Sequence, residues 1–176
     1  VILTQDLCRV CSIDLNTVRA VAAEMNPSPR IVSLDPHGLE DVFDDVLRVG
    51  AAVGLAEAAG EAVVRLRERM WRAADFVNPY VDGPRTAFLE WTDPLFIGGH
   101  WTPQLIERAG ARHPLNQTVA EDDAGAAAGP QAWARKAGKS VRIPEEVLVA
   151  MRPEALCQRL SRRIAVSCRL RSRTRQ

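Results

Sequence analysis

The chain alternates short apolar runs with longer segments in which apolar residues recur at helical spacing. Short runs of this kind are typical of buried strands, and they fall at 1–4, 30–34 and 85–89. The longer segments place apolar side chains along one face, as amphipathic helices do, and they cover 15–25, 39–53 and 56–77. This order predicts an α/β fold with two βα units, a long helix that no strand precedes, and a third βα segment.

The predicted helices carry recognisable boundary signals. Asp14 is a good N-cap for the first helix, and Pro27 and Pro29 follow its end. The helix at 56–77 has Glu residues four positions before Arg on its exposed side, which is the favourable order. At about 1.5 Å per residue this helix is roughly 30 Å long, enough to cross a small domain. We therefore expect two lobes joined by a helical bridge.

The most informative stretch is 85–110, where a predicted strand leads into a loop rich in aromatic side chains and then into a helix. Thr102 caps that helix, with Pro103 at its first position and Gly110 after its end. Ligands of open α/β sheets bind at the carboxyl ends of strands, and Gly98-Gly99 allows close backbone approach. We expect one wall of a binding site here, with the following candidates: Glu90, Trp91, Phe96, His100 and Trp101.

Structural roles compete with these assignments. Trp91 and Trp101 could instead fill the interface between sheet and helix. His100 could ligate iron or cobalt, hydrogen-bond a ligand amide, or be a solvated loop residue. Glu90 could bind polar ligand groups or cap a neighbouring helix. The sequence leaves these alternatives open.

The C-terminal part has weaker signals. The stretch 121–138 has low complexity and is expected to be a mobile insertion. Pro144 and two acids predict a helix at 145–151. Residues 157–176 form an arginine-rich tail, with seven arginines and no acid from Arg159 to Arg175, and we expect it to be disordered. No nucleic-acid partner is expected, because no aromatic residues are interleaved with the arginines.

Composition sets broad limits. The chain has 176 residues, which predicts one domain or two small lobes, and its net charge of +1 identifies no partner. No apolar run reaches the roughly 18 residues that predict a membrane span. The chain begins at Val1 inside an apolar run, with no charged leader, which indicates a fragment.

The four cysteines do not fix the redox compartment. Cys8 and Cys11 form a C-x-x-C that could be a metal pair, a redox pair or a local disulfide, and a single such motif is a weak zinc signal. No G-x-S-x-G, P-loop or G-x-G-x-x-G motif is present, so we expect no enzyme. The alternative is a metal-dependent enzyme that uses Cys8, Cys11 and a histidine.

Four segments together resemble the cobalamin-type solute-binding proteins of ABC importers, which have the class III periplasmic-binding-protein fold. The most specific are TQDLCRVC at 4–11 and FLEWTDPLFIGGHWTPQLIE at 88–107; RIVSLDPHGLEDVFDDVLRVG at 30–50 and IPEEVL at 143–148 add to them. The resemblance covers roughly 1–156.

The resemblance implies two Rossmann-like lobes joined by one long helix, incomplete at both ends. The remainder of the N-terminal lobe would be 1–54 and the bridging helix 55–78. A partial C-terminal lobe with the flexible insertion would be 79–156, followed by the tail at 157–176. The N-terminal part of the first lobe would precede Val1.

The resemblance also implies a function: capture of cobalamin, haem or a ferric siderophore in the cleft between the lobes. Gln5 and Asp6 would face the cleft from one side and the loop at 90–101 from the other. Glu145 matches the surface glutamate that docks arginines of the permease. No resident cofactor is expected, a monomer is expected, and the location would be periplasmic or otherwise extracytoplasmic. A truncated paralogue that no longer binds is the further alternative.

Overall fold

The computed structural model describes residues 1–6, 13–78, 80–120, 135–136, 138–160 and 165–170. It contains two compact units, Val1–Arg69 and Met70–Gln176. The boundary between them falls inside α3 (Ala56–Ala74), so one continuous helix carries the chain from the first unit into the second. The predicted α/β fold, with a long helix joining two units, is confirmed.

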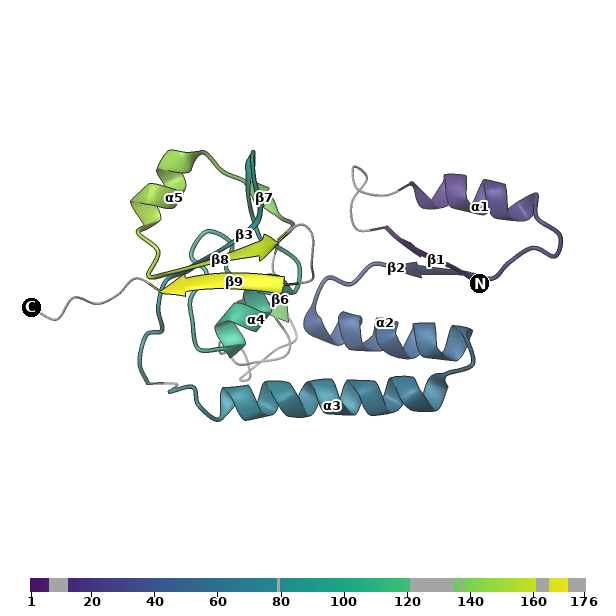
Figure 1. Cartoon of the computed structure of the whole chain (residues 1–176), viewed down its shortest axis with the longest axis horizontal. Coiled ribbons are helices and arrows are strands. Elements are labelled where there is room, and N and C mark those ends of the chain that lie inside the picture. Colours follow the sequence, from purple (N-terminus) through teal and green to yellow (C-terminus); the bar gives the residue numbers. More distant parts are fainter. Residues whose placement is uncertain (7–12, 79, 121–134, 137, 161–164, 171–176) are drawn as a thin grey trace, which may run out of the picture. The chain divides into compact units, whose positions relative to one another are not determined.

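The first unit is built on two parallel strands, β1 (Ile2–Gln5) and β2 (Ile31–Leu34). Figure 1 shows them between α1 (Leu15–Ala23), which packs on β1, and α2 (Leu39–Ala52), which packs on β2. Asp14 is the N-cap of α1, as predicted: its carboxylate accepts from the backbone N–H groups of the second and third helical residues, at 3.0 Å each.

Helices α2 and α3 pack closely in the first unit. Phe43 and Val63 are buried on them, and the guanidinium of Arg67 lies 5.2 Å from the centre of the Phe43 ring. A Cβ at Gly50 would meet the Cβ of Ala59 at 2.3 Å, so only glycine allows the two helices to approach this closely. Hydrophobic burial between these helices therefore holds the long helix against the first unit.

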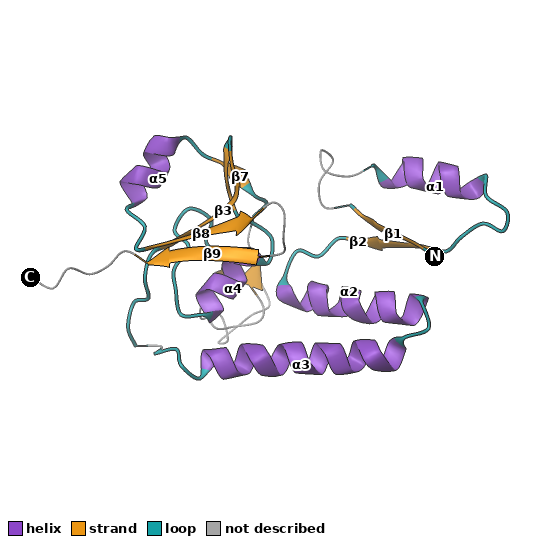
Figure 2. Cartoon of the chain, viewed as in Figure 1, coloured by secondary structure: helices purple, strands orange, loops and turns teal. Residues whose placement is uncertain are grey.

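The second unit contains a five-stranded sheet in the order β7-β4-β3-β8-β9, which Figure 2 colours orange. Its strands are β3 (Thr86–Thr92), β4 (Leu95–Ile97), β7 (Val141–Arg142), β8 (Ala155–Leu160) and β9 (Ala165–Leu170). The central strand β3 pairs in parallel with β8 and antiparallel with β4. Ala87, Leu89, Ile97 and Ile143 form the buried core.

Two short helices and a strand pair complete the second unit. They are α4 (Thr102–Arg108), α5 (Glu145–Met151), β5 (Val119–Ala120) and β6 (Arg135–Lys136). Beside them is a buried polar cluster, in which the Glu107 carboxylate accepts from the backbone N–H of Thr118 at 3.0 Å and lies 3.7 Å from the Arg135 guanidinium. His113 is fully buried, and neither of its ring nitrogens has a hydrogen-bond partner among the residues that the structure describes.

Several boundaries differ from the sequence predictions. β3 continues past Leu89 to Thr92, and β4 lies where a loop was expected, because a tight turn at Asp93-Pro94 folds the strand back into a hairpin. α4 begins at Thr102 rather than being capped by it; Trp101 is the N-cap and gives no side-chain cap.

The C-terminal strands are the largest difference. The expected disordered tail is wrong for Cys157–Leu160 and for Ala165–Leu170, which pair antiparallel as β8 and β9. Strand pairing, which the arginine-rich composition does not reveal, orders them. Cys157 is disulfide-bonded, and the register places Cys168 directly opposite it. Most of the expected insertion at 121–138 lies outside the described residues.

Candidate functional site

An aromatic hairpin, defined as β3 and β4 with the side chains of Trp91 and Phe96, is the first candidate site. One residue of β3, Glu90, lies between Leu89 and Trp91, but their partners Ile97 and Phe96 are adjacent on β4. Glu90 is therefore the extra residue of a β-bulge. The Leu89–Ile97 pair faces the core, so the next pair, Trp91–Phe96, faces the other side of the hairpin.

The bulge explains why a large indole is exposed. In a regular strand, Leu89 and Trp91 would share the buried face, because side chains two residues apart point the same way. The bulge turns Trp91 outward instead, and it is 59% exposed, with Phe96 half-buried opposite it. The register thus places Trp91 and Phe96 opposite each other on the same face of the hairpin.

The bulged residue holds the neighbouring loop in place. The Glu90 carboxylate accepts from the backbone N–H of Gly99 at 3.4 Å and from the hydroxyl of Ser140. A Cβ at Gly99 would meet the backbone nitrogen of Ser140 at 2.3 Å. The close approach that this glycine permits is therefore made by the chain's own segment at 138–140, and not by open space.

His100 and Trp101 follow in the same loop. The backbone N–H of His100 donates to the carbonyl of Gly138 at 2.9 Å, and His100 has a positive φ of 55°. The rings of His100 and Trp101 lie 6.0 Å apart between centroids, at an interplanar angle of 43°. Both side chains are half-buried, so these two candidates lie together at the start of α4.

The second candidate site lies in the first unit and is named the acidic hollow here. It has a volume of about 420 Å³ and forms where β1 and β2 end and α2 begins. It is lined by Asp6, Ser33, Asp35, Asp41, Asp44, Asp45 and Arg48. The sequence prediction included Asp6 here; Gln5, the last residue of β1, precedes it and is exposed.

Asp45 is the buried member of the acidic hollow. It is only 8% exposed, and burial raises the pKa of its carboxyl, against the opposing effect of Arg48. Arg48 donates to Oδ1 of Asp45 at 2.7 Å and to the Ser33 carbonyl at 2.9 Å. Oδ2 of Asp45 is buried and receives no hydrogen bond from the described residues.

Sequence reasoning missed most of the acidic hollow. Helical periodicity places the acids of α2 opposite its apolar stripe, so the pattern alone indicates a solvated face. One signal could have found them: Asp35 follows a predicted strand directly, at the end where open α/β sheets bind ligands.

Glu145 lies at a third place. It is the exposed first residue of α5 and lines a hollow of about 490 Å³ with Asp93, Arg142 and parts of the turn between β3 and β4. Among the described residues, three or more His, Cys, Asp or Glu side chains are nowhere grouped so as to hold a metal ion. Cys8 and Cys11 lie outside the described residues.

The helices that the structure describes include none that is both long and apolar enough to span a bilayer.

The fold defined by these elements is that of the class III periplasmic binding proteins. The periplasmic heme-binding protein RhuT from Roseiflexus sp. RS-1 matches with a TM-score of 0.59 at 18% identity, over 89% of this chain and 52% of RhuT. A periplasmic heme-binding protein from Pseudomonas aeruginosa matches with a TM-score of 0.60 at 18% identity, over 89% of this chain and 49% of that protein.

A third match is the periplasmic vitamin B12 binding protein BtuF of Vibrio cholerae, with a TM-score of 0.53 at 12% identity, over 89% of this chain and 52% of BtuF. The chain thus spans about half the length of these proteins. At the level of sequence, neither a protein-family model nor a curated protein matches. The predicted resemblance is confirmed as a likeness of fold.

Proposed function

We propose that the chain is part of a solute-binding protein that captures a corrinoid or an iron chelate for an ABC importer. The observation that carries this proposal is the β-bulge at Glu90, which exposes Trp91 beside Phe96 on the aromatic hairpin. A bulge that turns a tryptophan out of a core gives up hydrophobic burial, and such a feature is common next to binding sites.

The chemistry of the aromatic hairpin suits a large flat ligand. Aromatic rings stack in an offset manner on planar surfaces and gain about 0.5–1.5 kcal/mol each beyond burial. Corrins and porphyrins offer such surfaces. His100, beside Trp101, is the candidate for ligating the metal of the chelate or for hydrogen-bonding to its amides.

The structural neighbours support the same class of ligand. They are described as binding heme or vitamin B12, and a further neighbour is an ABC transporter substrate-binding protein. These neighbours are binding proteins rather than enzymes, and no observation on the described residues favours the metal-dependent enzyme that uses Cys8 and Cys11. Gln5, Asp6 and Glu90 are also proposed to contact the ligand.

Glu145 is the proposed docking residue for the importer. It is exposed at the start of α5, where a carboxylate is available to arginines of a partner. The proposed location is extracytoplasmic, because the neighbours are periplasmic and the Cys157 disulfide is of a kind that persists in oxidising compartments.

The test is a titration of the chain with cyanocobalamin, haemin and a ferric siderophore, followed by calorimetry or by absorbance-corrected tryptophan fluorescence. We expect saturable binding of one class. We expect Trp91→Ala to weaken it by about five- to tenfold, since loss of one stacked ring is worth roughly 1–1.4 kcal/mol.

The matched control is Trp71→Ala. Trp71 is 56% exposed on α3, against 59% for Trp91, and lies outside the aromatic hairpin. Equal loss of affinity in both variants would contradict the proposed site. Absence of binding by all three ligands, in a chain whose amide spectrum shows it folded, would contradict the proposed function.

A further inference from the structure

Strand β7 adds a charged residue to the aromatic hairpin. It pairs antiparallel with β4, and the register sets Arg142 directly opposite Phe96. Phe96 is in turn the partner of Trp91 on β3. Residues that pair directly on neighbouring antiparallel strands lie on the same face of a sheet. Trp91, Phe96 and Arg142 therefore form a row across three strands of the second unit, which we name the hairpin row.

The hairpin row lies on the face of the sheet that points away from the core. The Leu89–Ile97 pair faces the core, and Leu148 and Met151 pack against that core from α5. Helix α5 therefore covers the opposite face from the hairpin row. On the row itself, Arg142 is exposed, as the indole beside it is.

The guanidinium of Arg142 is available to a ligand. It forms no ion pair or hydrogen bond with any residue that the structure describes. An arginine with no carboxylate partner of its own can bind an anion without first breaking an ion pair. Three other arginines of the second unit do pair with carboxylates: Arg85 with Glu154, Arg112 with Asp82 and Arg135 with Glu107.

The carboxylates near the hairpin row lie off the row or are already engaged. Glu90 accepts hydrogen bonds from the segments that pack beside it, as described above. Asp93 and Glu145 line the hollow of about 490 Å³ together with Arg142. Asp93, however, lies in the turn beyond the last strand pair, and Glu145 begins α5, which packs on the core side. The row itself therefore carries one charge, which is positive.

The order of groups along the hairpin row matches a flat ligand with a carboxylate at its rim. Neighbouring strands lie about 4.8 Å apart, so the row spans roughly 10 Å, which is comparable to the width of a tetrapyrrole ring. Two aromatic side chains offer stacking surface at one end. At the other end, a guanidinium can hold a carboxylate through two parallel N–H···O bonds. Porphyrins of the haem type carry carboxylates at the rim, whereas the rim of cobalamin carries neutral amides.

We propose that Arg142 is the specificity-determining residue of the aromatic hairpin and selects planar chelates with carboxylates at the rim over corrinoids with a neutral rim. This inference rests on the proposed function and names the substrate class of the same site. Trp91 and Phe96 contact the face of the ring, and Arg142 binds the carboxylate at its edge.

The experiment compares metal-free protoporphyrin with its dimethyl ester, which has the same ring and no free carboxylate. Without a metal there is no axial ligation, so His100 cannot mask the effect. Both are added from the same small fraction of dimethyl sulfoxide at about 0.15 M salt, where nonspecific attraction between charges is screened. Porphyrin fluorescence follows binding. We expect the acid to bind about tenfold more tightly than the ester, because a hydrogen bond to a charged group is stronger than one to a neutral group.

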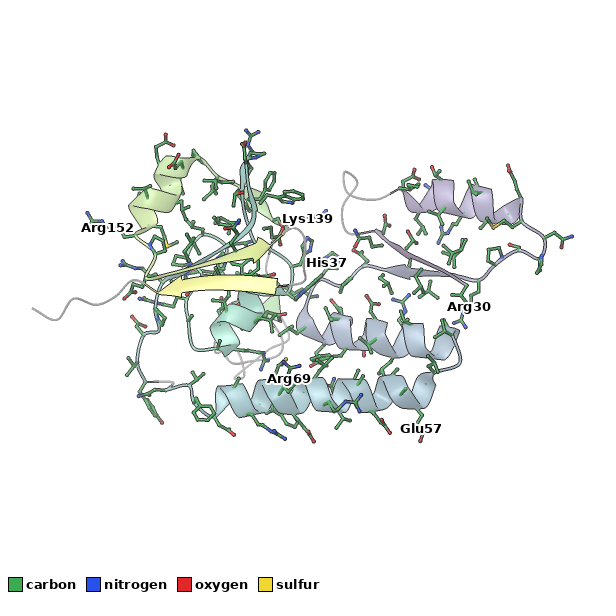
Figure 3. All side chains as sticks on the ribbon, viewed as in Figure 1. Arg30, His37, Glu57, Arg69, Lys139 and Arg152 are labelled. Carbon is green, nitrogen blue, oxygen red and sulfur yellow. The ribbon has the colours of Figure 1, made fainter. Side chains whose placement is uncertain are left out.

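The test variant is Arg142→Gln, in which we expect the acid and the ester to bind equally and the affinity for the ester to be unchanged. Arg142→Lys should keep part of the preference, because lysine retains the charge but not the planar fork. Arg152→Gln is the matched control. Arg152 is an exposed arginine at the C-terminal end of α5, away from β7 (Figure 3), and this variant should keep the full preference.

Three results would overturn the inference. In the first, the preference for the acid persists in Arg142→Gln. In the second, Arg152→Gln loses the preference to the same extent. The third concerns a structural role: β7 is an edge strand, and charged side chains on edge strands prevent sheets from associating. If Arg142→Gln self-associates on size-exclusion chromatography but still prefers the acid, Arg142 protects the edge and does not select the ligand.

A further titration, with cyanocobalamin, separates this inference from the proposed function. If cyanocobalamin binds as tightly as protoporphyrin, and its binding depends on Trp91 but not on Arg142, the inference is overturned and the proposed function stands. The same holds if cyanocobalamin or a ferric siderophore binds and protoporphyrin does not. If the folded chain binds none of these compounds, the proposed function fails and the inference fails with it.

Discussion

The acidic hollow and the aromatic hairpin are two ways of building a candidate binding surface from the same kind of fold. The hollow follows the general rule for open α/β units: parallel strands end together, and the residues that follow them converge with the first turns of the next helix. The hairpin depends on an irregularity, the bulge at Glu90, which reverses the direction of one side chain.

The difference shows which kind of substitution should disrupt each surface. The exposed acids of the hollow, Asp6 and Asp44, contribute charge, so neutral substitutions there should leave the fold intact. The hairpin is a matter of backbone packing, because the segment at 138–140 lies directly against Gly99. Mutations of these two acids therefore change the charge of the hollow, whereas a mutation at Gly99 disrupts the packing that supports the hairpin.

The largest effect is expected for Gly99→Ala. The added methyl would meet backbone atoms of Lys139 and Ser140 at 2.4 and 2.3 Å, and backbone cannot rotate away as a side chain can. We expect the second unit to lose about 3 kcal/mol of stability. Denaturant unfolding, with amide exchange read at β3, measures this loss.

Gly60→Ala on α3 is the matched control. A Cβ there would meet nothing within 4 Å, so the change should stabilise the helix by about 0.5–1 kcal/mol. If Gly99→Ala were as well tolerated as Gly60→Ala, the hairpin would not depend on backbone packing.

The next effect concerns acid and the second unit. Burial lowers the pKa of His113 below its usual value, although nearby Glu107 opposes the shift. As pH falls below about 6.5, the unfolded chain takes up a proton that the folded unit resists, so stability falls, by at most about 1.4 kcal/mol per pH unit. We expect His113→Leu to flatten this dependence, measured by thermal unfolding from neutral to acid pH.

His37→Gln serves as the control for that measurement, because His37 is a half-exposed histidine of the first unit. If the pH dependence of stability persisted in His113→Leu but disappeared in His37→Gln, the acid sensitivity would belong to the first unit. That outcome would contradict the prediction.

The smallest effect is expected for Asp45→Asn and has the opposite sign with pH. Burial raises the pKa of Asp45, so its contribution favours the folded state at low pH and is lost as pH rises through the raised pKa. The amide keeps an acceptor for Arg48 and removes the buried charge. We expect a gain of less than about 1 kcal/mol at neutral pH, without the wild-type pH dependence of this group.

Asp44→Asn, at the exposed neighbour on α2, should leave the free energy of unfolding within about 0.5 kcal/mol of the wild-type value. If both variants behaved alike, burial would not be the cause of the Asp45 effect.

Local patterns predicted most of the elements. Asp14 capped its helix as expected, and the periodicity of α2 and α3 was sufficient to place both within a few residues. The resemblance to solute-binding proteins was correct at the level of fold. These features depend on residues close together in sequence, so a single sequence contains them.

The features that could not be predicted depend on contacts between distant segments. The bulge at Glu90 exists because Leu89 and Trp91 pair with adjacent residues of β4, which no periodicity shows. The residues of β8 and β9 were expected to be disordered, because the many arginines interrupt the apolar pattern that indicates a strand. The acidic hollow forms only when the ends of β1 and β2 meet the start of α2 in the folded chain, and the sequence pattern does not show that meeting.

The pairing of β3 with β8 has a consequence for synthesis. β1 and β2 can pair as soon as the chain has passed Leu34, whereas β3 must wait for Ala155–Leu160, after α4 and α5 have been made. Pairing of distant strands is slow, because the entropy of closing a long loop is lost before contacts are gained. While the chain is being made, β3 therefore has β4 as its neighbour on one side and an unpaired edge on the other until β8 has been synthesised.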